Sequence, residues 1–118
     1  MNVKDLLENE ELMNFIVEDI EDIPEDSEVT YEVWALGRTD CGEATTDEVI
    51  IGAFADPDMA IACAEKVTLN QIETELGGRA PKADTAYFSI EVETVVVDPE
   101  DDGAMNIGTI YSCDVWVW

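Results

Sequence analysis

The chain has 118 residues, 47% of them hydrophobic, and 29 acidic residues against 5 basic ones give a formal net charge of −24 at pH 7. Length and hydrophobic content fit one globular domain over residues 1–118, and the charge excludes direct binding of nucleic acid or of an anionic membrane, because both would be repelled. The chain contains no histidine. Since histidine is the commonest general base and a frequent metal ligand, we expect neither an enzyme nor a cofactor.

The N-terminal residues 1–11 carry one lysine and an acidic excess. A secretory signal would instead begin with basic residues followed by an apolar block, so we expect a cytoplasmic protein. The odd number of cysteines, without close spacing, disfavours both a disulfide framework and a zinc site. Cys63 and Cys113 lie within apolar patterns and are expected to be small buried hydrophobes, whereas Cys41 lies in a loop and is the thiol to test for reactivity.

Residues 3–22 show helical spacing, because their apolar side chains share one arc at 100° per residue. The pattern predicts one amphipathic helix that ends before Pro24. The apolar residues on this arc are Val3, Leu6, Leu7, Met13, Ile16, Val17 and Ile20.

The rest of the chain is predicted to form two hairpins separated by one helix. Strands are predicted over residues 29–36 and 48–54, then over 86–97 and 105–118, with residues 98–103 as the second turn. Between the hairpins, Asp56 and Pro57 start a helix that runs to Leu76 and stops at Gly77 and Gly78. The predicted order is αββαββ: an α+β fold with a four-stranded antiparallel sheet packed with two helices.

Acidic residues gather on the side of the first predicted helix opposite its apolar arc. Six charges over 14 residue steps would give roughly one charge per 3.5 Å, close to the ~3.4 Å between phosphates of one DNA strand. The alternative is an ordinary solvated face, but such faces mix signs to form Glu–Lys pairs, which this one lacks. The charges are those of Glu8, Glu11, Glu18, Asp19, Glu21 and Asp22, and the turn carrying Glu25, Asp26 and Glu28 extends them.

Alternation along the strands also places carboxylates beside aromatic rings. If helices cover one sheet face alone, the other presents a mixed acidic and aromatic surface that suits a basic protein partner. The alternative is that the first helix covers these aromatic residues. The C-terminal strand could also pair edge to edge and form a homodimer. The residues concerned are Glu32, Trp34, Tyr87, Glu91, Glu93, Asp114, Trp116 and Trp118.

One segment of the chain is an imperfect candidate for a metal-binding loop. Asp98, Glu100, Asp102 and Gly103 imitate the first half of an EF-hand loop, but Thr109 stands where the bidentate glutamate is required. The flanks are predicted strands, so a hairpin turn is the better interpretation. Any two carboxylates among 29 could approach by chance, so a glycosidase-like pair is equally unspecific.

In size, charge, lack of catalytic residues and helix-plus-sheet layout, the chain resembles the acidic DNA-mimic inhibitors of phages and mobile elements, including many anti-CRISPR proteins. The resemblance implies a protein that occupies the nucleic-acid channel of a basic host enzyme such as a CRISPR effector nuclease. Two alternatives remain: an assembly or regulatory module whose acidity only confers solubility, and an acidic metal-dependent enzyme. The predicted partner-binding residues are Glu8, Glu11, Glu18, Asp19, Glu21, Asp22, Glu25, Asp26, Glu32, Glu91, Glu93, Asp114, Trp116 and Trp118.

Overall fold

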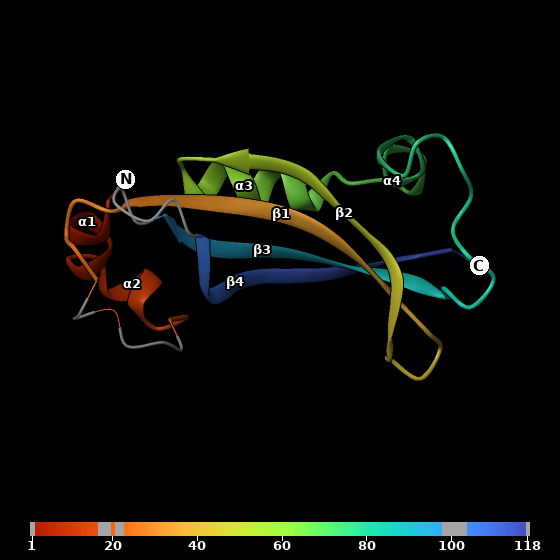
Figure 1. The fold of residues 1–118 in the computed structure, drawn as a ribbon, viewed down its shortest axis with the longest axis horizontal. Coiled ribbons are helices and arrows are strands. Elements are labelled where there is room, and N and C mark those ends of the chain that lie inside the picture. The colour runs from red at the N-terminus through yellow and green to blue at the C-terminus, as the bar shows by residue number, and fades with distance from the viewer. Residues whose placement is uncertain (1, 17–19, 21–22, 98–103, 118) are drawn as a thin grey trace.

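The computed structural model describes residues 2–16, 20, 23–97 and 104–117. The molecule measures 43 × 27 × 24 Å along its principal axes. Two short helices precede the first hairpin, and two more separate it from the second (Figure 1). In chain order the elements are α1 (Val3–Leu7), α2 (Glu10–Met13), β1 (Glu28–Arg38), β2 (Ala44–Phe54), α3 (Pro57–Glu65), α4 (Leu69–Glu75), β3 (Tyr87–Val97) and β4 (Ala104–Trp116).

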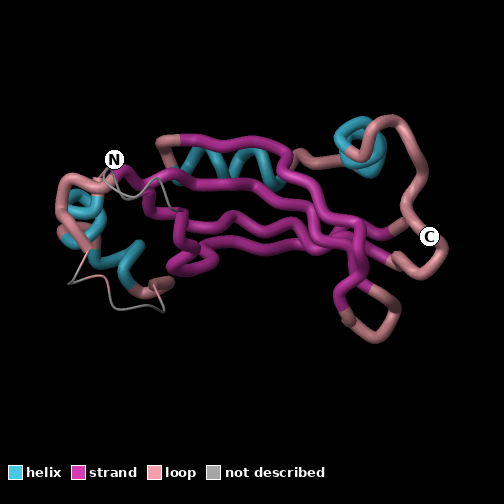
Figure 2. The backbone as a smooth tube through the Cα atoms, viewed as in Figure 1, coloured by secondary structure: helices cyan, strands magenta, loops and turns pink. Residues whose placement is uncertain are grey.

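The four strands form one antiparallel sheet in the order β2-β1-β3-β4. Both predicted hairpins are present, and they join through the long pairing of β1 with β3, which runs from Glu28 opposite Val97 to Arg38 opposite Tyr87. The first strand of each hairpin is therefore central, while β2 and β4 border the sheet (Figure 2). The four-stranded antiparallel sheet and the α+β class are confirmed.

The prediction of one continuous helix over residues 3–22 is wrong for the described part. Asn2 caps α1, whose helix ends at Leu7, and the Asn9 side chain then accepts a hydrogen bond from the Leu12 amide at 3.1 Å. Asparagine is among the best N-cap residues, so Asn9 starts a second helix instead of continuing the first. Residues 17–19 and 21–22 lie outside the described residues.

The helix predicted between the hairpins is also divided in two. Its start at Asp56 and Pro57 is confirmed, and so is its stop, where Gly77 and Gly78 adopt the positive φ values of 89° and 83° that favour glycine. In the interior, Lys66 caps the end of α3, and the Thr68 hydroxyl accepts the Gln71 amide at 3.2 Å to begin α4. Neither glycine nor proline marks this break in the sequence, so the prediction ran one helix across it.

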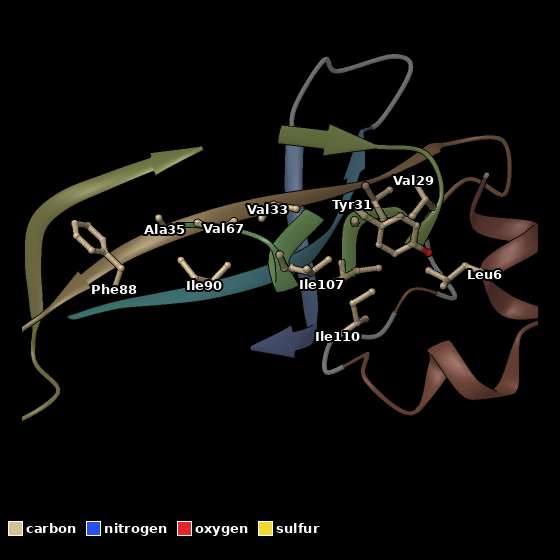
Figure 3. Close-up of a cluster of buried hydrophobic side chains, with 14 of the residues drawn as sticks. Leu6, Val29, Tyr31, Val33, Ala35, Val67, Phe88, Ile90, Ile107 and Ile110 are labelled. Atoms are coloured by element: carbon tan, nitrogen blue, oxygen red, sulfur yellow. The ribbon is translucent and has the colours of Figure 1, made fainter. Parts of the chain in front are cut away.

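The hydrophobic core lies on one face of the sheet, beneath the helices (Figure 3). On β3, Phe88, Ile90, Val92 and Val96 share the inner face and are all buried. β1 contributes the alternate residues from Val29 to Ala35, including Tyr31. Burial and the nearby charge of Asp56 raise the pKa of Tyr31 to about 12. At Gly108 the backbone of Phe15 approaches so closely that a Cβ would collide with it, so the N-terminal segment packs on β4 here.

Candidate protein-binding face of the sheet

All four described helices pack on the same side of the sheet. α1 contributes Leu6 to the core cluster, α3 contributes Ala64 and α4 contributes Ile72, while Leu12 of α2 packs against it. Side chains that alternate with the core residues point to the opposite side. We call this side the outer face, and it carries Glu32, Trp34, Arg38, Glu48, Tyr87, Glu91, Glu93, Asp114 and Trp116.

Four glutamates meet near the middle of the outer face. Glu32 of β1 lies directly opposite Glu93 of β3, and the next outward pair along these strands is Trp34 with Glu91. Glu48 joins them from β2, where it lies opposite Leu36. Side chains that face each other across two strands have Cβ atoms about 4.5–5.5 Å apart, and like charges at that separation destabilise the sheet. This cluster therefore weakens the isolated protein.

This unfavourable environment raises the pKa of Glu93. Burial among its neighbours raises it above the ordinary glutamate value, and the negative charges of Glu91, Glu32 and Glu48 raise it further. Compensating positive charge is scarce, because Arg38 is the only basic residue in the four strands. Its Nη2 atom lies 3.7 Å from Oε2 of Glu91. Among the described residues, no ion pair reaches Glu93.

Aromatic rings lie beside the glutamates on the outer face. The indole Nε1 of Trp34 donates a hydrogen bond to Oε1 of Glu32 at 3.1 Å. Tyr87 and Trp116 stack with ring centroids 4.6 Å apart and planes inclined by 36°. The Trp116 side of this pair is open, since the residue is 56% exposed. The alternative that the first helix covers these rings is wrong for the described part, because α1 packs on the other side of the sheet.

The remaining predicted residues divide between exposed positions and positions outside the described part. Asp114 is exposed on the outer face opposite Ser89. Glu8, Glu11, Glu25 and Asp26 are exposed near the N-terminal helices. Because Glu8 caps the end of α1 and Glu11 lies in α2, the two do not share one straight helical ridge, and that part of the prediction is wrong. Outside the described residues lie Glu18, Asp19, Glu21, Asp22, Trp118 and the predicted turn 98–103.

Sequence reasoning missed Glu48 and its neighbour Asp47. Glu48 could be assigned to the outer face only with the β1–β2 register, which shifts twice and so defeats simple alternation. Asp47 is fully buried, and its carboxylate accepts hydrogen bonds from the Lys82 amide at 2.7 Å, from the Thr85 hydroxyl at 2.9 Å and from Arg79 Nη2 at 2.7 Å.

The pKa of Asp47 shows the outcome of these contacts. Burial alone would raise it, but the Lys82 amide, Arg79 and the Thr85 hydroxyl together hold the pKa below its usual value. All three partners lie in the segment between α4 and β3. Asp47 therefore remains ionised and anchors that segment to β2, which is a structural role and not that of a proton donor.

Metal-type clusters and the cysteines were the remaining candidates for reactive groups. Among them, no group of three or more cysteine, aspartate or glutamate side chains is arranged to hold a metal ion. Cys41 is exposed, but a hydrogen bond with Asp40 and the charge of Asp40 raise its pKa, so less of the reactive thiolate forms at neutral pH. Cys63 and Cys113 are half-buried against the core.

Comparison with protein-family models, with curated proteins and with solved structures finds no match to this chain. Within the described residues, none of the helices has the length and apolar character needed to cross a membrane.

Proposed function

We propose that this protein is a non-catalytic inhibitor that mimics nucleic acid and occupies the basic channel of a nucleic-acid-binding host protein, such as a CRISPR effector nuclease. The observation that carries the proposal is the outer face, where Glu32, Glu48, Glu91 and Glu93 gather in strands that contain one basic residue. The setting proposed for it is the cytoplasm. Its carboxylates stand in for phosphates.

A basic partner would relieve the strain within the glutamate cluster. Arginine or lysine side chains placed over Glu32 and Glu93 would turn a repulsive pair into an attractive network, and the elevated pKa of Glu93 would fall. Trp116 and Trp34 offer ring surface on which guanidinium groups stack, at about 0.5–1 kcal/mol for exposed cation–π contacts. The net charge of −24 would speed the encounter with such a partner.

The alternative function is a small assembly or regulatory module in which acidity only maintains solubility. One feature favours it: β4, at the border of the sheet, carries the exposed apolar residues Met105 and Trp116. In that case the glutamates of the outer face would contribute little to partner binding. Variants that remove charge from either the outer face or the helical side distinguish the two proposed functions.

The test begins with capture of basic proteins from a bacterial lysate and proceeds with the purified partner. The double variant Glu32→Gln/Glu93→Gln is compared with Glu65→Gln/Glu75→Gln, which removes two exposed charges from the helical side. We expect the first to weaken binding about tenfold or more, equivalent to ~1.4 kcal/mol, and the second to weaken it much less.

Two further readouts belong to the same experiment. Added duplex DNA should displace the protein from its partner, and raising salt from about 50 to 200 mM should weaken the complex steeply, because the contacts are between charges. Equal losses in the two double variants, or binding that neither DNA nor salt disturbs, would contradict nucleic-acid mimicry and favour the assembly module.

A further inference from the structure

The two borders of the sheet are protected to different degrees. Strand β2 carries Asp47 and Glu48 and pairs with β1 through two register shifts. The Asp47 carboxylate holds the segment around Lys82 against it, and Lys82 Nζ also donates to the Thr46 hydroxyl. Charges, irregular pairing and an attached segment are devices that prevent further strands from adding to an edge. The β2 border is therefore protected, most directly around Thr46 and Asp47.

The β4 border has few of these devices. In its 13 residues, β4 contains one charged side chain, Asp114, and neither lysine nor proline. Two register shifts interrupt its pairing with β3 near Glu93 and Val95, but from Tyr111 to Trp116 the pairing is regular. Within the described part of the chain, no other strand pairs with β4. The whole chain has a net charge of −24, so an edge strand with a single charged side chain is unusual in it.

The backbone of this segment is oriented to accept another strand. Val117 donates its amide to the Ala86 carbonyl, on the β3 side. Successive residues of a strand direct their amide and carbonyl groups to opposite sides, so those of Val115 and Cys113 also point to β3. The corresponding groups of Ser112, Asp114 and Trp116 then point away from the sheet, where they can bond to a neighbouring strand.

We propose that β4 pairs with β4 of a second copy of this chain, antiparallel and centred on Cys113. In this register Cys113 faces Cys113 of the second copy, Ser112 faces Asp114, and Tyr111 faces Val115. Charge favours this register over one centred on Asp114, which would oppose two carboxylates, whereas here each Asp114 lies opposite a neutral serine. The strand also buries the otherwise exposed rim beside Trp116.

The pairing is independent of the proposed function but has a consequence for it. A two-fold axis normal to the sheet joins the strands antiparallel and keeps both outer faces on the same side. The dimer is thus one eight-stranded sheet with two glutamate clusters on a continuous surface. Self-association must also overcome the repulsion between two highly negative molecules, so salt should strengthen the dimer. Salt weakens the proposed complex with a basic partner.

The first test is cross-linking by oxidation of the full-length protein alone. A Cys41→Ser/Cys63→Ser variant retains Cys113 as its one cysteine. In the proposed register the two Cys113 residues form a non-hydrogen-bonded pair, whose Cα atoms are about 4.5 Å apart and so within disulfide range. Mild oxidation by diamide should give a covalent dimer at low micromolar protein, and the triple variant lacking Cys113 should give none. A monomer after oxidation, at a concentration where the protein otherwise sediments as a dimer, would overturn the register.

The second test measures the dimer dissociation constant by sedimentation at about 50 and 500 mM salt. Ser112→Asp places a carboxylate opposite Asp114 of the second copy and should weaken the dimer about tenfold. Asn106→Asp is the matched control, since it adds the same charge to an exposed position of β4 outside the paired segment. A monomer at both salt concentrations, or equal effects of the two variants, would overturn the proposal without affecting the binding of a basic partner.

Discussion

Asp47 and Glu93 lie on opposite faces of the same sheet, Asp47 buried on the core side and Glu93 on the outer face, and their surroundings differ in kind. Asp47 has three hydrogen-bond donors within 2.9 Å, and its pKa is lowered. Glu93 has three carboxylates around it, and its pKa is raised. Asp47, the one fully buried carboxylate among the described residues, is fully hydrogen-bonded, whereas Glu93 lies among other carboxylates and forms no ion pair within the described part of the chain. That contrast supports the proposal that the outer face binds a partner.

The largest expected difference between the two sides concerns aromatic side chains. Phe88 is fully buried in the core and Trp116 is 56% exposed on the outer face, although both lie in paired strands. Phe88→Ala should lower the free energy of unfolding by about 3–5 kcal/mol, because it removes core contacts and leaves a cavity. Trp116→Ala should change it by less than about 1 kcal/mol. Urea denaturation of both variants measures the difference, and equal losses would contradict the assignment of the two faces.

A smaller effect is expected at Asp47. Asp47→Ala should destabilise the protein by about 1–3 kcal/mol, since the Lys82 amide and the Thr85 hydroxyl lose their acceptor. The pKa of Asp47 is lowered in the folded state, so its contribution is present above the unfolded value near 3.9 and is lost as the pH falls through the folded value. Denaturation curves at pH 7 and pH 3 should therefore differ less in Asp47→Ala than in the wild type.

The smallest effect has the opposite sign. Glu93→Gln should stabilise the isolated protein at pH 7 by up to about 1 kcal/mol, because it removes one member of the opposed pair with Glu32. The folded-state pKa is raised, so the wild type gains stability as the pH falls from neutral through that value, and the advantage of the variant shrinks. Thermal unfolding at pH 7 and pH 5 measures both changes. A destabilised Glu93→Gln variant at pH 7 would show that the glutamates serve the fold.

Much of the fold could be predicted from local signals. Asp56 with Pro57 and Gly77 with Gly78 mark a helix start and stop by their own backbone preferences. Alternation grouped Phe88, Ile90 and Val92 on one face of the sheet, and the structure shows that this is the core face. The interior helix breaks at Asn9 and Thr68 were missed because the capping residues sit inside an uninterrupted apolar pattern. At these two positions the N-cap hydrogen bonds decide where a helix begins, although the apolar periodicity continues through them.

The candidate site was predictable only in part, because it depends on register between strands distant in sequence. Alternation indicated that Glu91 and Glu93 share a face with Tyr87, but it could not show that Glu32 lies opposite Glu93. Glu48 joins the cluster through a hairpin with two register shifts, which no short-range pattern reveals. The anchoring of Asp47 by residues more than 30 positions away is likewise a tertiary property.

We propose above all that a basic partner binds the outer face of the sheet. The most direct measurement is an NMR titration of the wild-type protein with an arginine-rich peptide, following backbone amides and the Trp34 indole proton, which is bonded to Glu32. We expect the largest shifts at Trp34, Glu91 and Glu93, and we expect salt to reverse them. Shifts spread evenly over all acidic surfaces, or confined to the helices, would contradict it.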